Sequence, residues 1–302
     1  MADEAALEIT DLHKNYGTVR ALRGVNLNVQ RGEVFGFLGP NGSGKTTTIR
    51  CLLDLIRPTS GRIHVLGLDP QTDPTEVRAR CGYLPGELHL DDNYSVEGAL
   101  RFLNRLRGDK AEWAYVVSLA RRLDLPLDMK VKNLSKGNKQ KVGVVQALMH
   151  RPEMLLLDEP TSGLDPLMQQ VVLKLIAEAR SDGATVFFSS HVLSEVQSVA
   201  ERVAIIRLGV VVEVAETSSL LQRSFRRVRL KFREPVDSAP ILAVPGVLVM
   251  GRDNGAGMLL QVAGEMDGLI RALAPMPVSE LETERPTLEE IFLAYYTAPE
   301  GQ

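Results

Sequence analysis

The segment 34–55 constrains the fold of this chain more than any other. A continuous apolar run from Val34 to Leu38 leads into Gly39-Pro40-Asn41-Gly42-Ser43-Gly44-Lys45-Thr46, and a helical pattern follows from about Lys45 to Leu55. The octapeptide fits G-x-x-x-x-G-K-[ST] in full, with the buried strand before it and the helix after it that the motif requires. The segment therefore predicts an α/β phosphate-binding unit. This context disfavours the alternative, an ordinary glycine-rich turn.

The residue types in this loop suit the binding of a nucleoside triphosphate. Glycines let backbone N–H groups curl around phosphate oxygens without Cβ clashes, and the following helix points its positive end at the anion. We expect Lys45 to reach the β- and γ-phosphates and Thr46 to hold Mg²⁺. The predicted ATP-binding loop comprises Gly39, Pro40, Asn41, Gly42, Ser43, Gly44, Lys45, Thr46 and Thr47.

A second apolar strand ends in two carboxylates. Met154-Leu155-Leu156-Leu157 runs directly into Asp158-Glu159. In a buried parallel strand Asp158 would lie near Mg²⁺, while Glu159 would orient or deprotonate the attacking water. Many strands end in an acid that merely caps the next helix. Beside a phosphate loop, however, the pair predicts ATP hydrolysis, with Lys45, Asp158 and Glu159 in catalytic roles.

Strand and helix patterns alternate along most of the chain, which predicts a largely parallel α/β sheet preceded by an antiparallel β region. The pattern turns helical from about Thr75 to Leu125, and another helix is expected from Ser135 to His150. After about Leu221 the composition changes. We expect a nucleotide-binding domain over 1–221 with a helical subdomain at about 86–150, and a small α+β accessory domain over 222–302. Within the accessory domain the pattern predicts strands over 228–232 and 258–262 and helices over about 266–273 and 288–296.

The order of the motifs resembles that of nucleotide-binding subunits of ATP-binding-cassette (ABC) transporters, a class of P-loop NTPase. In that family a signature, often L-S-G-G-Q, precedes the acidic strand, and here it reads Leu134-Ser135-Lys136-Gly137-Asn138. Lys136 and Asn138 depart from the commonest pattern, whereas Ser135 and Gly137 keep the hydroxyl and the glycine. The resemblance implies that this helix end meets the γ-phosphate bound by a second copy. A plain capped helix is the alternative.

Three further elements match the family in order. The run Ser162-Gly163-Leu164-Asp165 resembles the D-loop, which implies a place for Asp165 at the dimer interface. His191 resembles the switch histidine, whose neutral imidazole would hydrogen-bond the γ-phosphate and position Glu159. Tyr16 resembles the aromatic residue that stacks on adenine, with a packing role as the alternative.

One position departs from the family pattern. The family has a Mg²⁺-binding glutamine just after the strand near Gly82–Pro85, and this chain reads Gly86-Glu87 there. Glycine has no side-chain ligand, so either Glu87 or water would take that place. The alternative for Glu87 is a solvated loop acid.

Composition limits the partners and the compartment. Net charge is −3, which gives no reason to expect nucleic acid. The chain has only two cysteines, Cys51 and Cys81, without paired spacing, and these give no basis for a disulfide framework or a zinc site. The acidic start lacks the features of a signal peptide, and no apolar run approaches the roughly 20 residues that span a bilayer. We expect a cytoplasmic chain that is peripheral on the inner face of the cell membrane.

The tail resembles the small C-terminal domain of ATPase chains from ABC-2-type exporters, as does the closing stretch Arg285–Phe292. This resemblance implies a separate membrane permease as partner, contact with the membrane through that permease, and a homodimer with two shared sites. The basic cluster Arg223–Arg233 is expected to be the solvated face of a strand with Val228, Leu230 and Phe232 buried. Binding of lipid or nucleic acid is the alternative.

The function predicted from these features is ATP hydrolysis that powers an exporter. One rival is a soluble cassette protein acting on ribosomes or DNA, but this chain has one phosphate loop, no repeat and no room for a long coiled coil between Lys45 and Asp158. A second rival is a nucleotide-gated regulator without turnover, which the intact Glu159 and His191 disfavour. The ordered signature, D-loop and histidine disfavour other kinases and GTPases.

Overall fold

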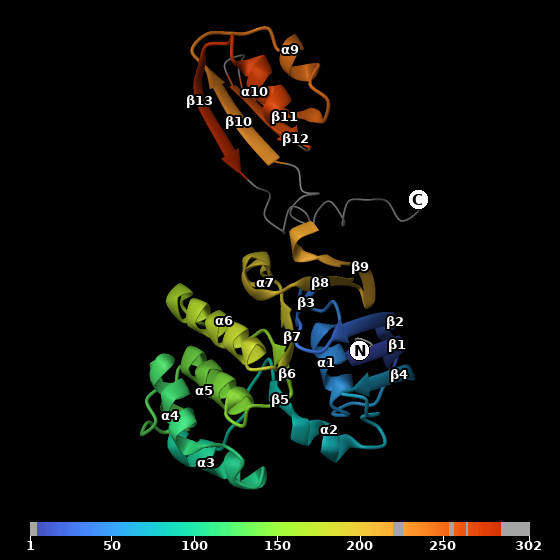
Figure 1. The fold of residues 1–302 in the computed structure, drawn as a ribbon, viewed down its shortest axis with the longest axis vertical. Coiled ribbons are helices and arrows are strands. Elements are labelled where there is room, and N and C mark those ends of the chain that lie inside the picture. The colour runs from blue at the N-terminus through green and yellow to red at the C-terminus, as the bar shows by residue number, and fades with distance from the viewer. Residues whose placement is uncertain (1–4, 220–225, 254–256, 264, 285–302) are drawn as a thin grey trace. The chain divides into compact units, whose positions relative to one another are not determined.

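A computed structural model describes residues 5–219, 226–253, 257–263 and 265–284 (Figure 1). The chain divides into two compact units, residues 1–215 and 216–302, and each is described by itself. This division lies six residues before the composition change at 221/222, near the end of the strand over Val210–Glu216. Among the described residues, no helix combines the length and apolarity that a membrane span requires.

The first unit contains two sheets. A three-stranded antiparallel sheet has the order β2-β1-β4, and a six-stranded sheet has the order β5-β6-β7-β3-β8-β9. The strands of the first are β1 (Ala5–Tyr16), β2 (Val19–Gln30) and β4 (Ser60–Val65). Those of the second are β3 (Val34–Leu38), β5 (Cys81–Leu84), β6 (Met154–Asp158), β7 (Thr185–Ser190), β8 (Arg202–Arg207) and β9 (Val210–Glu216). The antiparallel β region and the parallel sheet are thus both present as predicted.

The centre of the larger sheet is buried on both faces. Every residue of β3, β6 and β7 is buried, as continuous apolar runs in parallel sheets require. Phe35 pairs with Phe187 across β3 and β7, and their rings stack with centroids 5.9 Å apart. Phe37 adds a second ring contact with Phe187 at 5.2 Å. This packing holds the parallel strands in one register.

Helices cover the larger sheet and form a helical part of the first unit. They are α1 (Lys45–Leu52), α2 (Pro74–Arg80), α3 (Val96–Leu106), α4 (Trp113–Arg122), α5 (Lys136–Leu148), α6 (Pro166–Ser181) and α7 (Leu193–Val199). In Figure 1, α3, α4 and α5 gather on one side of the sheet, and the three-stranded sheet lies on the other. The pattern that turns helical from Thr75 is interrupted by β5, which the sequence also indicated.

Glycines allow α5 to lie directly on β5. A Cβ at Gly82 would come within 2.1 Å of the Ala147 carbonyl oxygen, and one at Gly143 within 2.4 Å of Leu84 Cδ1. Only the absence of both side chains permits this approach. The helix that begins at the predicted signature is therefore anchored to the same sheet that ends in the predicted catalytic carboxylates.

The described residues of the second unit form a four-stranded antiparallel sheet, in the order β11-β12-β10-β13, accompanied by the short helices α9 and α10. These are β10 (Arg226–Phe232), β11 (Val247–Asp253), β12 (Gly257–Val262), β13 (Val278–Glu284), α9 (Ala239–Leu242) and α10 (Asp267–Leu273). The predicted strands 228–232 and 258–262 and the helix 266–273 correspond to β10, β12 and α10. The sequence did not indicate β11 or β13. The predicted helix 288–296 lies outside the described residues.

Two described members of the basic cluster, Arg229 and Lys231, lie on the exposed face of β10. Val228, Leu230 and Phe232 are buried, as predicted. On the opposite face Arg229 pairs with Glu282 at 3.6 Å and Lys231 with Glu280 at 2.7 Å, both acids on β13. Strand β13 was missed because its exposed acids conceal the alternation, although these acids complement the basic strand beside it.

A half-buried guanidinium joins the helical part to the sheet. Arg107, at the end of α3, donates to the carbonyls of Arg78 and Cys81, each at 3.3 Å, and its Nη1 lies 3.1 Å from His150 Nε2. Burial lowers the pKa of Arg107. Burial, together with the nearby Arg107 charge, lowers the pKa of His150 to about 4. A proton on His150 is therefore disfavoured in the folded chain.

This arrangement predicts acid destabilisation through His150. Its folded-state pKa lies below the ordinary 6.5, so the unfolded chain binds the proton more readily. Stability is full above about pH 6.5 and falls as the pH drops toward 4. We expect His150→Asn to reduce the loss of unfolding free energy between about pH 6.5 and 4 by on the order of 1–3 kcal/mol. Urea unfolding at a series of pH values measures this loss. His89→Asn, at an exposed position, is the control. If it reduced the acid-induced loss of stability as much as His150→Asn does, the assignment to His150 would be contradicted.

Candidate functional site

The carboxyl ends of three adjacent parallel strands bring the predicted catalytic residues together. Strand β7 lies between β3 and β6. In the paired register Leu38 lies beside Ser190, and Asp158 beside Ser189. The loop that begins at Gly39, the acids that follow β6 and the histidine that follows β7 therefore meet at one edge of the sheet. Ligand sites of open α/β sheets form at this edge.

The phosphate loop is shaped by glycines. A Cβ at Gly39 would lie 2.5 Å from Ser43 Oγ and 2.6 Å from the Ile206 carbonyl oxygen. Gly44 has φ of 116°, a conformation that favours glycine, and it precedes α1 with no side-chain cap hydrogen bond. The first N–H groups of α1 have no partner within the helix. An uncapped helix start of this kind is suited to an anion.

Lys45 is folded back across the loop. Its Nζ donates to the carbonyls of Gly39 at 2.5 Å and Pro40 at 3.2 Å, and lies 3.1 Å from Glu159 Oε1. The residue is only 5% exposed. A buried ammonium needs such partners. A phosphate that binds Lys45 must therefore displace one of the three, and Glu159 is the only one that is a side chain.

Glu159 is held from four directions. Its backbone N–H donates to Ser189 Oγ at 3.0 Å, and its carbonyl accepts from Gln140 Nε2 at 2.9 Å. Its carboxylate lies between Lys45 and His191, whose Nδ1 is 2.7 Å from Glu159 Oε2. The backbone adopts φ of 52°, which costs energy for a residue with a side chain. The surrounding contacts therefore impose a fixed direction on this carboxylate.

Asp158 fits the role of a metal ligand. It is 1% exposed, and its Oδ1 accepts from Ser189 Oγ at 2.6 Å. Its Oδ2 is buried and has no hydrogen-bond partner in the protein. An unpaired carboxylate oxygen beside a phosphate loop is the ligand type that Mg²⁺ prefers. Burial first, and then the Asp158 charge, raise the pKa of the nearby Tyr83, which keeps that phenol neutral.

The residue next to the unpaired oxygen is Gly86 rather than Glu87. A Cβ at Gly86 would lie 3.0 Å from Asp158 Oδ2. Glu87 is exposed and makes no hydrogen bond or ion pair with the described residues. Nowhere in the described part of the chain do three His, Cys, Asp or Glu side chains converge as a ready metal cluster.

Ser135 and Gly137 lie at the start of α5, as predicted. Ser135 is the N-cap, and its Oγ accepts from the Asn138 N–H at 3.2 Å. A Cβ at Gly137 would lie 2.8 Å from the Gly163 carbonyl oxygen. The signature and the D-loop of one chain are therefore in direct contact, and Gly137 is required for that contact as well as for any approach to phosphate.

The structure places Asp165 at a helix start and Tyr16 at the end of a strand. Asp165 caps α6, because its Oδ1 accepts from the N–H groups of Leu167 at 3.1 Å and Met168 at 3.0 Å. Tyr16, at the end of β1, is 46% exposed, and Lys14 Nζ lies 5.0 Å from its ring centroid. The Asp165 carboxylate is thus already engaged, whereas the Tyr16 ring has exposed surface on which a base can stack.

Sequence reasoning missed the polar residues that connect the strand ends. Ser189 bridges Asp158 and the Glu159 backbone. Glu195, on α7, accepts hydrogen bonds from Thr161 and Ser190. The available signal was a pair of hydroxyls, Ser189 and Ser190, that end an otherwise apolar strand. The signal for Glu195 was a single acid among the buried positions of a short helix.

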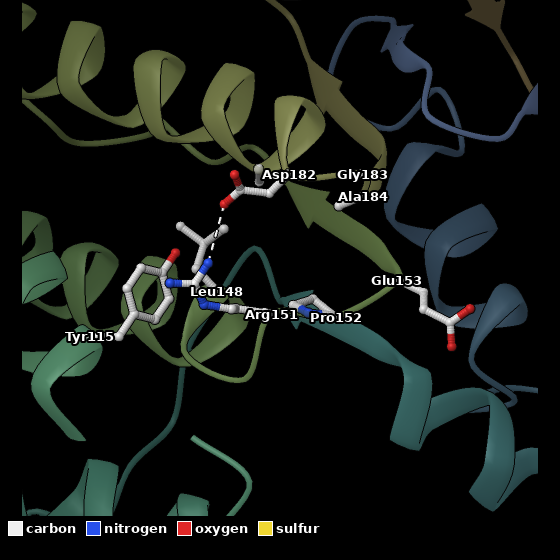
Figure 2. Close-up of a pocket in the computed structure, with 9 residues that line it drawn as sticks. Tyr115, Leu148, Arg151, Pro152, Glu153, Asp182, Gly183 and Ala184 are labelled. Atoms are coloured by element: carbon white, nitrogen blue, oxygen red, sulfur yellow. Dashed lines mark hydrogen bonds and ion pairs between the residues drawn. The ribbon is translucent and has the colours of Figure 1, made fainter. Parts of the chain in front are cut away.

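A separate hollow lies at the opposite edge of the sheet (Figure 2). It has a volume of about 160 Å³, and its lining includes Arg151–Glu153 before β6 and Asp182–Ala184 before β7. Arg151 stacks on the Tyr115 ring at 4.2 Å and pairs with Asp182 at 3.4 Å. Its charged groups are thus engaged in ion pairs, since Glu153 pairs with Arg80 at 2.6 Å. The hollow lies at the strand ends away from the catalytic residues.

Known proteins share this fold and these motifs. A family model described as ABC transporter matches residues 22–162, which include the phosphate loop and both carboxylates. The daunorubicin resistance ATP-binding protein DrrA3 of Streptomyces coeruleorubidus is 33% identical, over 97% of this chain and 96% of that protein. The bacitracin transport ATP-binding protein BcrA of Bacillus licheniformis is 37% identical over 72% of each chain. A solved ATP binding subunit of an ABC transporter superposes with a TM-score of 0.66 at 30% identity, covering 71% of this chain and 91% of that one.

The Lys45–Glu159 pair predicts opposite effects of one substitution on binding and on turnover. Glu159→Gln removes the competitor of phosphate for Lys45, so ATP binding should be retained or strengthened. Loss of the base should lower the hydrolysis rate by about 10²–10⁴-fold. Phosphate release and equilibrium ATP binding measure the two quantities. Glu178→Gln, in an exposed pair with Arg122, is the control. Unchanged turnover in Glu159→Gln would exclude the assigned role.

The close approach of signature and D-loop predicts the result of adding one methyl group. Gly137→Ala places a Cβ 2.8 Å from a backbone oxygen that cannot move freely. We expect hydrolysis to fall at least about tenfold while ATP binding to the phosphate loop persists. Gly251→Ala, where a Cβ would meet nothing within 4 Å, is the matched control. Wild-type turnover in Gly137→Ala would show that this contact is unnecessary.

Proposed function

The chain belongs to the ABC transporter ATP-binding family, and on that premise we propose that it is the ATP-hydrolysing subunit of an ABC exporter. It binds and hydrolyses ATP, as its family does. The observation that carries the assignment is the convergence of Lys45, Glu159 and His191 at 3.1 and 2.7 Å. Hydrolysis would change the conformation of a separate ABC-2-type membrane permease.

The catalytic step begins with an exchange of partners at Lys45. Phosphate oxygens take the place of the Glu159 carboxylate, and the freed carboxylate stays beside His191 to orient or deprotonate water. Mg²⁺, held by Thr46 and Asp158, would neutralise phosphate charge. The unpaired Asp158 Oδ2 supports this role.

His191 links proton transfer to recognition of phosphate. A neutral imidazole carries one N–H, so it donates either to Glu159 or to a phosphate oxygen, but not to both. The tautomer with its N–H on Nε2 would donate to a phosphate oxygen, and its Nδ1 could then only accept a hydrogen bond. Glu159 supplies that hydrogen bond once its carboxylate has taken the proton from water. In this tautomer, the neutral histidine predicted from the sequence is therefore compatible with both contacts after proton transfer.

In a homodimer, two complete ATP sites would form although each chain carries each motif once. Each site would combine the phosphate loop of one copy with Ser135 and Gly137 of the other. The single copy of each motif supports this arrangement, as does the position of Ser135 at an exposed helix start. Contact between Gly137 and Gly163 would connect the two elements of one copy that face its partner.

An apolar surface on the helical part supports a membrane partner. Phe102 and Leu106 are 45% and 69% exposed and lie one helical turn apart on α3, and Tyr94, which is 42% exposed, stacks on Phe102 at 5.9 Å. Such exposed apolar clusters mark interaction sites. We assign this surface to a cytoplasmic segment of the permease, which would hold the chain at the inner face of the membrane. Relatives named for drug resistance and bacitracin transport support the exporter subgroup.

Affinity purification tests this proposal. The Glu159→Gln chain should retain ATP and a closed dimer, and should recover a stoichiometric multi-helix membrane protein from detergent-solubilised cells. Phe102→Ser with Leu106→Ser should reduce that recovery at least about tenfold. Leu55→Ser, at another exposed apolar residue, is the control. Recovery of ribosomes or DNA-binding proteins without a membrane protein would assign the ATPase to the soluble branch of the family.

A further inference from the structure

We infer that Glu195 is a positioning residue for ATP hydrolysis. From α7 it would fix the separation between the segment that carries Glu159 and the segment that carries His191. The inference rests on the ATPase activity of the family and is independent of whether the partner is an exporter. None of the sequence motifs includes this residue, and it does not touch the phosphate loop.

Both oxygens of the Glu195 carboxylate are engaged. Oε1 accepts from Thr161 Oγ1 at 2.6 Å, and Oε2 accepts from Ser190 Oγ at 2.7 Å. Glu195 is 6% exposed and forms no ion pair with any described residue. A buried carboxylate without a cation depends on its hydrogen bonds, and charge-assisted bonds of this length are the strong ones. The carboxylate therefore holds the two hydroxyls at a fixed distance.

The two hydroxyls stand next to the catalytic pair. Thr161 lies two residues after Glu159, and Ser190 comes directly before His191. Ser190 Oγ also accepts from the Val192 N–H at 2.9 Å, so the peptide is held on both sides of the histidine. The contact between His191 Nδ1 and Glu159 Oε2 closes this ring of interactions at 2.7 Å. A shift of either strand end would lengthen that contact.

The same carboxylate sets the start of the D-loop. The Leu164 N–H donates to the Thr161 carbonyl at 3.2 Å, which forms the turn that presents Gly163. The Gly163 carbonyl is the group that Gly137 approaches. A path of direct contacts thus runs from Ser190 through Glu195 and Thr161 to the signature. In a symmetric dimer this path would connect the histidine of one ATP site with the signature that serves the other.

Conservative variants separate positioning from simple structural support. Glu195→Gln, Ser190→Ala and Thr161→Val each remove one part of the network with little change of volume. We expect kcat of the purified chain to fall about tenfold to hundredfold, with the ATP Kd within about twofold of wild type. Thr161→Ser keeps the hydroxyl and should restore turnover. Glu201→Gln, in an exposed pair with Arg180 at 2.8 Å, is the control.

A double-variant measurement gives the decisive readout. In a His191→Ala background, Ser190→Ala and Glu195→Gln should lower kcat by less than about twofold more, because they act through the histidine. Equal additional loss in that background would overturn the inference, as would wild-type kcat in all three single variants. If Glu195→Gln lowers the Tm too far for assay, Ser190→Ala leaves the carboxylate bonded to Thr161 and still tests it.

A spectroscopic readout does not depend on turnover. The chain has five histidines, so their ring resonances can be assigned by substitution. Ser190→Ala and Glu195→Gln should move the ring resonance of His191 and leave that of exposed His89 unchanged. An unmoved His191 signal in both variants would contradict a positioning role, whatever the ATPase rates are.

Discussion

The parallel pairing of β3, β7 and β6 is the constraint on which the functional site depends. Because the three strands end side by side, the loop after β3, the histidine after β7 and the acids after β6 meet without long connections. The stacked Phe35 and Phe187 rings resist sliding of one strand past its neighbour. A one-residue change of register would turn each terminal side chain to the other face of the sheet.

Much of this arrangement could be predicted from the sequence. Buried strands have continuous apolar sequences, which can be recognised directly. The phosphate loop has a glycine pattern that few other structures require. The strands β3 and β6 and the helices α1 and α5 were therefore predicted, with Ser135 at the start of α5. The second unit was harder, because β13 is rich in exposed acids and its strand character comes from pairing with β10. Tertiary context of that kind is absent from a single sequence.

The residues of the site could be predicted from the sequence, whereas the contacts between them could not. Asp158, Glu159 and His191 were identified, but the Lys45–Glu159 ion pair depends on three-dimensional distances that spacing does not give. Asp165 was assigned by resemblance, and the structure shows its carboxylate capping α6. Glu195 was not identified, because one acid in a short helix has no distinctive pattern. Its importance appears only where two strand ends share its oxygens.

The ion pair between Lys45 and Glu159 has a consequence for ligand selection. The lysine is bound to an acid of its own chain, so every incoming anion competes with a tethered rival whose effective concentration is in the millimolar range. A single small anion, such as inorganic phosphate, has only one group with which to displace that rival. A polyphosphate also engages the N–H groups of the loop and the start of α1, and so gains several contacts at once. The protein would thereby favour a polyphosphate over a simple anion through the number of contacts that each can make.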